Sequence, residues 1–153
     1  MPAIHQSTVV NAPIETVFDA LDDPEALPQY VPPMTRVREV RRSDQRLGDS
    51  FQATYVVLGM HFDETFTCAE YVRPTKLVHR FAGPMTGSMG ATLTPQDGAT
   101  TRVDLDIEYQ MPGGVVGKVA DALLVERMNE KNAERMLENL KLIVESRAST
   151  SPA

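Results

Sequence analysis

The hydrophobic residues in the last third of the chain recur at the spacing of an α-helix. Over residues 112–147 they fall at every third or fourth position, which places them on one side of a helix. At about 1.5 Å per residue such a helix would be roughly 45–50 Å long, more than the width of a compact domain of this size, so we expect a bend or a projecting end. In the middle of the stripe Glu126 and Asn129 stand between Ala122 and Ala133, where a solid core would require larger apolar side chains. The pattern therefore predicts space for a ligand beneath the helix.

The first third of the chain predicts one strand followed by short helices. Residues 4–10 alternate as a strand does, and Pro13 opens a helix that carries apolar residues on one face. Residues 24–27 begin a second short helical turn. Pro28, Pro32 and Pro33 then bracket a stiff connection that we expect to be irregular.

Residues 35–111 predict about six strands joined by short turns. Turn residues occur at 43–44, 58–59, 73–74, 83–84 and 97–98 with no helical period between them, so neighbouring strands should pair antiparallel. The fold class is therefore α+β, a curved antiparallel sheet of about seven strands whose apolar face is covered by the C-terminal helix. We expect a single domain over residues 1–147 and a disordered tail at 148–153, because no repeat or linker divides the chain.

The composition is that of an acidic globular protein. The 153 residues are 42% hydrophobic and 24% charged, with a net charge of −6 and a pI near 5.0. Since a basic stripe with interleaved aromatic residues is absent, we expect neither nucleic acid nor an anionic membrane surface as the main partner. The single Cys68, the lack of a signal-like start and the lack of a membrane-spanning apolar window predict a cytoplasmic protein.

Nothing in the sequence predicts a metal or a cofactor. His5, His61 and His79 are too scattered to form a local ligand pattern, and no CxxC pair exists. The glycines at 113–114 lack the lysine and spacing of a phosphate-binding loop, and the GxSxG turn of a hydrolase is absent. We therefore expect no bound cofactor and no metal site.

Four phrases of the sequence carry a family resemblance. They are Asn11-Ala12-Pro13-Ile14-Glu15-Thr16-Val17-Phe18, Asp23-Pro24-Glu25-Ala26-Leu27-Pro28, Pro112-Gly113-Gly114-Val115-Val116-Gly117 and Leu137-Glu138-Asn139-Leu140-Lys141. Through them the chain resembles the SRPBCC superfamily over nearly its whole length, and most of all its bacterial polyketide cyclase/dehydrase-like and START-like members. The resemblance implies a helix-grip fold, in which the sheet wraps around the C-terminal helix, two short helices close one side and a hydrophobic cavity lies between. It does not choose among the superfamily's lipid and sterol carriers, ubiquinone-binding proteins, polyketide aromatase/cyclases, co-chaperone domains and oxygenase α-subunit domains.

The predicted cavity wall combines apolar side chains with a few polar ones. Glu64 shares a strand face with two phenylalanines, so it is a candidate acid/base or ligand anchor, unless that face is exposed at an edge or Glu64 pairs with Arg or Lys. Glu126 and Asn129 could fix a ligand's carbonyl or hydroxyl, unless the helix turns both outward or Glu126 pairs with a cation. The eight methionines would suit a cavity that adapts to different apolar ligands, or they fill gaps in the core.

A hairpin about residues 73–74 would place His79 near Cys68. The two could form a thiolate–imidazole pair, or they could be a core histidine beside an inert thiol. Because no third group that would orient the imidazole can be identified, we predict no catalytic nucleophile.

Three functions stay open. The first is non-catalytic binding or transport of a small hydrophobic or amphipathic molecule, such as a lipid, a quinone or a polyketide-like compound. The second is a polyketide cyclase, aromatase or dehydrase in which Glu64 or His79 moves protons, and this requires both inside one cavity. The third is an interaction module, monomeric or homodimeric, that docks a subunit through apolar residues beside the main helix stripe, among them Leu124 and Met128. The candidate ligand-binding residues are Tyr55, Phe62, Glu64, Phe66, His79, Phe81, Met89, Tyr109, Ala122, Glu126, Asn129, Ala133 and Met136.

Overall fold

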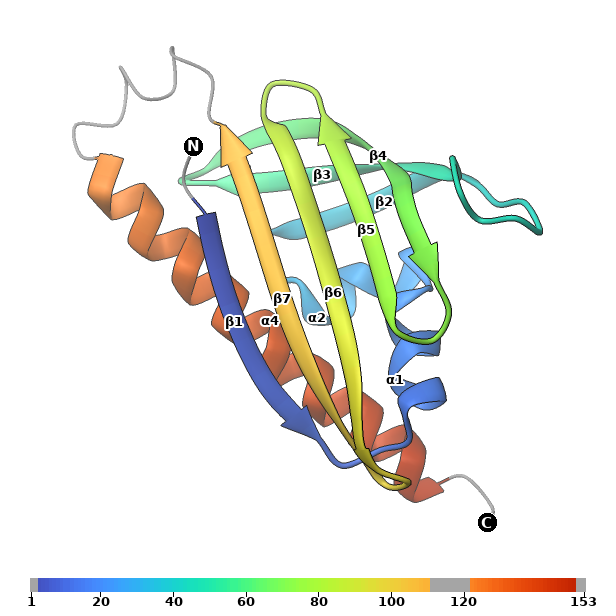
Figure 1. Ribbon diagram of the computed structural model, residues 1–153. Helices are drawn as coiled ribbons and strands as arrows, with labels where there is room; N and C mark the ends of the chain where they lie inside the picture. Colours follow the sequence, from blue (N-terminus) through green and yellow to red (C-terminus); the bar gives the residue numbers. More distant parts are fainter. Residues whose placement is uncertain (1–2, 111–121, 151–153) are drawn as a thin grey trace.

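One curved antiparallel sheet carries a long helix across one of its faces (Figure 1). The structure, a computed structural model, describes residues 3–110 and 122–150. Its seven strands lie in the order β1-β7-β6-β5-β4-β3-β2, and all neighbours are antiparallel. The elements are β1 (Ala3–Val10), α1 (Ile14–Leu21), a 3-10 turn (Pro24–Ala26), α2 (Leu27–Tyr30), β2 (Met34–Arg41), β3 (Ser50–Val57), β4 (Met60–Val72), β5 (Lys76–Ala82), β6 (Thr86–Asp97), β7 (Thr100–Gln110) and α4 (Ala122–Thr150). The predicted α+β, helix-grip architecture is confirmed.

The strand order explains the position of the short helices. β1 and β2 are consecutive in sequence but occupy opposite edges of the sheet, because β1 pairs with β7 while β2 pairs with β3. The chain between them therefore has to cross from edge to edge, and α1 and α2 make this crossing below the sheet (Figure 1). Both helices contact α4 there, so they and the long helix share one side of the sheet.

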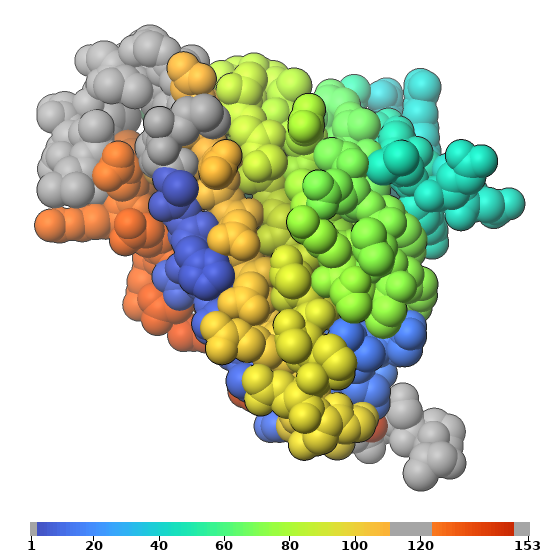
Figure 2. All heavy atoms as spheres, in the orientation of Figure 1, coloured from blue at the N-terminus to red at the C-terminus, as the bar shows by residue number. Residues whose placement is uncertain are grey.

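The predicted turns fall between the observed strands at all five places. Leu58 and Gly59 form a two-residue turn, with φ angles of 50° and 78°, the conformation that such a hairpin requires. The turn between β2 and β3 is longer and projects from the body of the protein, where it is drawn in teal in Figure 2. The prediction of an irregular connection near residue 30 is wrong, since residues Leu27–Tyr30 form α2. Pro28 is compatible with this helix because it lies in the first turn, where its missing N–H is not needed.

The described part of the long helix starts after the predicted helix start. α4 begins at Ala122, while residues 111–121, which include the Pro-Gly-Gly phrase and the predicted helix start, lie outside the described residues. It ends at Thr150 instead of residue 147, and its 29 residues give a length of about 43 Å at 1.5 Å per residue. Its buried stripe packs on the sheet and consists of Val125, Asn129, Ala133, Met136, Leu137, Leu140 and Val144.

Candidate ligand-binding site

Two cavities lie between the sheet and the helices. The first, which we name the apolar cavity, lies under the first half of α4 and encloses about 630 Å³ of empty space, open solvent at its mouth included. Its described walls come from β1 to β7, the turn between β5 and β6, the chain between α2 and β2, and α4. They are Ile4, Val31, Pro33, Met34, Tyr55, Glu64, Phe66, Phe81, Met85, Met89, Ile107, Tyr109, Asn129, Asn132, Ala133 and Met136.

Strand register brings the apolar wall together from residues far apart in sequence. Phe66 on β4 lies opposite Phe81 on β5, and their ring centroids are 5.4 Å apart. Met89 on β6 lies opposite Ile107 on β7. Each of these side chains points to the concave face because alternate residues of a strand share a face, so neighbouring strands contribute neighbouring wall positions.

Glu64 is the most deeply buried polar group of the apolar cavity. The residue is only 1% exposed, and its side chain accepts a hydrogen bond from the Met85 backbone N–H at 2.8 Å through Oε1. Its other oxygen, Oε2, has no hydrogen-bond partner among the described residues. Burial raises the pKa of Glu64, as does the charge of Asp63, while the Met85 N–H lowers it. The carboxyl group is therefore protonated more readily than an exposed glutamate and can donate a proton into the cavity.

Tyr109 and Asn129 place two further polar groups on the same wall. The Tyr109 hydroxyl and the Asn129 Oδ1 are buried, and neither has a hydrogen-bond partner of good geometry among the described residues. They are neighbours nonetheless, because the Asn129 side chain lowers the pKa of Tyr109. This partly offsets the larger rise that burial causes. Burial also raises the pKa of Tyr55, which lies on the cavity wall. The two tyrosines and the asparagine are thus neutral hydrogen-bonding groups.

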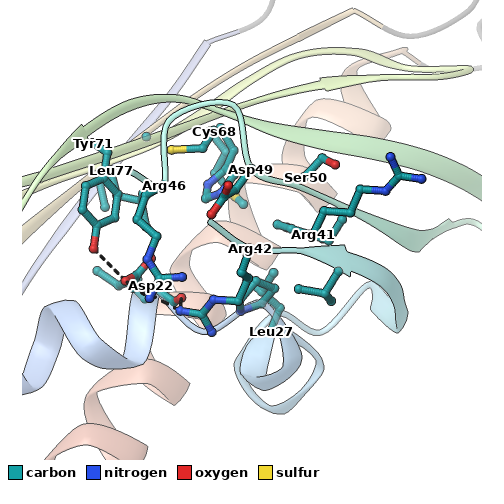
Figure 3. Close-up of a pocket in the computed structure, with 18 of the residues that line it drawn as sticks. Asp22, Leu27, Arg41, Arg42, Arg46, Asp49, Ser50, Cys68, Tyr71 and Leu77 are labelled. Atoms are coloured by element: carbon teal, nitrogen blue, oxygen red, sulfur yellow. Dashed lines mark hydrogen bonds and ion pairs between the residues drawn. The ribbon is translucent and has the colours of Figure 1, made fainter. Parts of the chain in front are cut away.

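The second cavity, which we name the arginine-rimmed cavity, opens near the end of α1 (Figure 3). It encloses about 680 Å³ of empty space, open solvent at its mouth included. Its interior is apolar, and its rim carries three arginines and two aspartates. Its described walls are Leu21, Asp22, Pro24, Leu27, Tyr30, Val40, Arg41, Arg42, Arg46, Asp49, Ser50, Phe51, Cys68, Tyr71, Leu77, His79, Met89, Gly90, Ala91, Leu105 and Met136.

Asp22 is the centre of an ion-pair cluster on this rim. Its carboxylate accepts a hydrogen bond from the Tyr71 hydroxyl at 2.8 Å and lies 3.5 Å from Arg46 and 4.0 Å from Arg42. Arg42 also donates to the Asp22 backbone carbonyl at 3.2 Å. Figure 3 shows these side chains converging from α1 and from the turn between β2 and β3, while Arg41 points away from them. The cluster therefore ties the projecting turn to the end of α1.

His79 and Cys68 are paired across β4 and β5, as the hairpin prediction required. The Cys68 thiol donates to the Glu70 carbonyl at 3.6 Å, and burial raises its pKa. Burial lowers the pKa of His79 to about 4, although the charge of Asp22 opposes this, and its ring stands edge-on to Phe51 at 5.5 Å. A protonated thiol beside a neutral imidazole is no activated nucleophile, so the interpretation as a core histidine and an inert thiol holds.

The structure brings most of the predicted site residues together and separates the others. Nine of them line the apolar cavity: Tyr55, Glu64, Phe66, Phe81, Met89, Tyr109, Asn129, Ala133 and Met136. His79 lines the arginine-rimmed cavity instead, so Glu64 and His79 do not share one chamber. Phe62 is buried in the core and Glu126 is half-buried, and neither lines a cavity. Ala122 opens α4, and its side chain lies outside the described part of the structure.

Several wall residues were not predicted from the sequence. Pro33 belongs to the proline-rich connection, which the pattern marks only as a stiff spacer, and Met34 follows it. Asn132 lies about one helical turn beyond Asn129 on α4. The arginine rim had a visible signal, the sequence Arg41-Arg42 followed by Arg46 around a predicted turn. A basic run in an acidic chain marks a local charge, but its position beside Asp22 depends on the edge-to-edge crossing of the chain.

The described residues provide no metal cluster and no membrane-spanning helix. Within residues 3–110 and 122–150, no group of three or more His, Cys, Asp or Glu side chains is arranged to hold a metal ion. None of the described helices is long and apolar enough to cross a membrane. On α4, Leu124 is 51% exposed, whereas Met128 packs against the core. Docking of a second subunit there stays a prediction.

Comparisons with known proteins place this architecture in context. A family model described as polyketide cyclase/dehydrase and lipid transport matches residues 1–145. Among solved structures, the Zhui aromatase/cyclase from Streptomyces sp. R1128 is similar, with a TM-score of 0.77, 20% identity and 99% of each chain covered. TTHA0849 from Thermus thermophilus gives a TM-score of 0.73 and 22% identity, covering 98% of this chain and 100% of that one. A START superfamily protein from Mycobacterium smegmatis gives 0.66 and 20%, covering 96% of this chain and 97% of that one. No curated protein matches the chain by sequence.

Proposed function

The chain belongs to the polyketide cyclase/dehydrase and lipid transport family, and from this we propose that it binds a small hydrophobic or amphipathic molecule in the apolar cavity. The ligand class is a lipid, a quinone or a polyketide-like compound. The cavity has the predominantly apolar lining typical of sites for such molecules.

One observation supports this proposal above the others. Glu64 Oε2, the Tyr109 hydroxyl and Asn129 Oδ1 are three buried polar atoms on one apolar wall. None forms a hydrogen bond of good geometry among the described residues, although the Asn129 side chain is close enough to lower the pKa of Tyr109. An unpaired buried polar group costs about 1–3 kcal/mol, so three of them together are expensive if their only role is packing. A ligand that forms hydrogen bonds with them would offset this cost.

The chemistry of the three groups defines what the ligand should present. A protonated Glu64 and the Tyr109 hydroxyl are donors, while Asn129 Oδ1 is an acceptor. A ligand with a carbonyl oxygen near the first two and a hydroxyl near Asn129 would satisfy all three. The cavity wall also carries four methionines, whose flexible side chains would adapt to different apolar bodies. They are Met34, Met85, Met89 and Met136.

The second candidate function is catalysis by Glu64. A buried carboxyl group with a raised pKa and one free oxygen in a cavity is suited to act as a general acid, as a cyclase, aromatase or dehydrase would require. His79 lies on the other cavity, so this reaction would have to proceed with Glu64 as the only titratable group of the pair. Glu64→Gln distinguishes the two functions: an enzyme loses turnover of a polyketide-like substrate while it still binds, and a carrier has no turnover to lose.

The binding proposal is tested with defined probes and a matched pair of variants. Menadione and naphthol would be titrated into the protein by calorimetry, together with native mass spectrometry of the protein as extracted from cells. Asn129→Leu removes a cavity acceptor, and we expect it to weaken naphthol binding about tenfold. Gln110→Leu is the control, since Gln110 is exposed and lies next to Tyr109 along β7. Absence of any co-purified apolar molecule, with no binding of either probe, would contradict the proposal.

A further inference from the structure

The two cavities meet at two methionines. Of the described residues, only Met89 on β6 and Met136 on α4 line both the apolar cavity and the arginine-rimmed cavity. Met89 reaches the boundary from the sheet and Met136 from the helix that covers it. The two cavities therefore share two side chains that come from opposite walls.

Both of these side chains are intrinsically flexible. Methionine has three rotatable bonds and no branch, so it changes rotamer at low cost. Next to the boundary, Phe51 of the arginine-rimmed cavity is stacked on Phe66 of the apolar cavity, with centroids 5.0 Å apart and ring planes inclined by 4°. We call the boundary formed by Met89 and Met136 the partition. The stacked aromatic pair beside it is rigid, so the partition would open at the flexible methionines.

The far end of the combined space carries two arginines that share one carboxylate. Arg42 and Arg46 lie on the rim with Asp22 and Asp49, while the Arg41 side chain points away (Figure 3), and among the described residues the ion pairs of Arg42 and Arg46 go to Asp22 alone. Asp22 is shared between Arg42 and Arg46 at 4.0 and 3.5 Å, and neither contact has the geometry of a close ion pair. An incoming anion can therefore bind these guanidinium groups.

The arginine-rimmed cavity offers one more polar group deep in its wall. The Tyr30 hydroxyl is buried and has no hydrogen-bond partner among the described residues, and burial raises the pKa of Tyr30. The lining also includes His79, and Leu27, Phe51 and Leu77 supply apolar surface. The cavity thus changes from charged to apolar in the direction of the methionines.

We infer that the two cavities act as one channel for an elongated amphipathic anion. Its carboxylate or phosphate head binds Arg42 and Arg46, and its apolar chain passes Met89 and Met136 into the apolar cavity. This inference rests on the proposed function, because it assigns the same apolar cavity to the chain of the ligand, and it adds the class of molecule and its orientation.

The length of the ligand provides the first test. Octanoate, dodecanoate and hexadecanoate would be titrated calorimetrically, with hexadecanol as the uncharged control and hexadecyl phosphate as the second anion. A chain that continues through the partition gains about 0.8 kcal/mol per buried methylene, so the affinity should rise about three- to fourfold for each one added. Hexadecanoate or hexadecyl phosphate should bind at least about tenfold more tightly than hexadecanol, and the tighter of the two identifies the head group.

Variants at the two ends of the channel provide the second test. Arg42→Gln and Arg46→Gln should each weaken hexadecanoate binding about tenfold and leave hexadecanol binding unchanged. Arg80→Gln, on an exposed residue of β5, is the control and should change the binding of neither ligand. Met136→Phe places a stiff ring in the partition and should reduce the affinity for hexadecanoate to that for octanoate. Met89→Phe makes the same change from the sheet if the helix variant fails to fold, and Met128→Phe is the control on α4, because Met128 lines neither cavity.

The outcomes separate this inference from the proposed function. Naphthol binding that depends on Asn129, combined with an affinity for fatty acids that is independent of chain length or of Arg42 and Arg46, would overturn the channel alone. Absence of binding by every probe would overturn both. Chain-length dependence that survives Met136→Phe and Met89→Phe would show that the chain lies elsewhere, and it would also overturn the channel.

Discussion

The carboxyl group of Glu64 lies over Gly83, in the space where a side chain at that position would begin. A Cβ atom built on Gly83 would collide with Glu64 Oε2 and would lie 2.7 Å from the Asp63 backbone carbonyl oxygen. The turn between β5 and β6 therefore closes over β4 at this point, and the next residues bring the Met85 N–H to Glu64 Oε1. The glycine is what allows a buried carboxyl group to be held on the wall of the apolar cavity.

Gly83→Ala is expected to destabilise the fold by about 1–3 kcal/mol, because the methyl group would displace both the Glu64 carboxyl and the β4 backbone. Urea unfolding would measure the loss. Gly98→Ala is the control, since a Cβ at Gly98 would meet nothing within 4 Å. Equal stability of the two variants would contradict the close approach of Glu64 to Gly83.

Glu64 should also make stability depend on pH in a defined direction. Because burial raises the pKa of Glu64 in the folded protein, its contribution is fully present below the unfolded value of 4.5 and is lost as the pH rises through the folded pKa. The glutamine in Glu64→Gln cannot ionise, so the variant does not lose this stability contribution as the pH rises. Relative to wild type, the variant should gain about 1–3 kcal/mol, the cost of a buried polar group without its full set of partners, as the pH rises. Chemical unfolding between about pH 5 and about pH 8 would test this. A difference that does not change with pH would contradict the raised pKa.

The sequence predicts the face of the sheet to which the Glu64 side chain points, but it does not predict which cavity the side chain lines. Side chains alternate along a strand, so the neighbours Phe62 and Phe66 already placed Glu64 on the concave face. The same rule placed His79 on that face. It says nothing about how far along a curved sheet each residue lies, and this distance puts Glu64 and His79 in different cavities.

Local chemistry predicted the turns, and long-range order decided the rim. Leu58-Gly59 and Gly83-Pro84 mark chain reversals because their backbone conformations are specified by the residues themselves. Arg42 and Asp22, by contrast, are twenty positions apart and meet only because the chain crosses from β1 to β2 beneath the sheet.

The helix stripe was predicted correctly in its period but not in its exact facing. Glu126 and Asn129 share one stripe in the sequence, and both were candidates for the cavity wall. Positions three apart on a helix still differ in direction by about 60°, however, and this difference leaves only Asn129 on the wall. Sequence periodicity gives the side of a helix, whereas the packing of the helix on the sheet decides which edge of that side faces the cavity.

His79 should affect stability at acidic pH in the opposite direction to Glu64. Its pKa is lowered from 6.5 to about 4 by burial, so its contribution is present above 6.5 and is lost as the pH falls towards 4. His79→Gln has no imidazole to protonate and should lose about 1–2 kcal/mol less than wild type over this range, since part of the ring remains accessible. Denaturant unfolding of both proteins at several pH values gives the comparison. The control is His61→Gln, on an exposed residue of β4, and a similar effect in both variants would contradict the assignment to His79.

Tyr109 offers a prediction in which stability and affinity change in opposite directions. Its hydroxyl is buried without a hydrogen-bond partner of good geometry. Tyr109→Phe therefore removes a polar atom that contributes little to the stability of the ligand-free protein. We expect the free variant to be as stable as wild type or more stable by about 1 kcal/mol, as measured by thermal unfolding. In the presence of naphthol the order should reverse, because the variant has lost a hydrogen bond to the ligand and should bind it about tenfold more weakly. Tyr71→Phe provides the contrast, since its hydroxyl is bonded to Asp22 at 2.8 Å and its loss should destabilise the free protein. If Tyr109→Phe instead weakens the free protein as Tyr71→Phe does, the hydroxyl has a structural partner and is not held ready for a ligand.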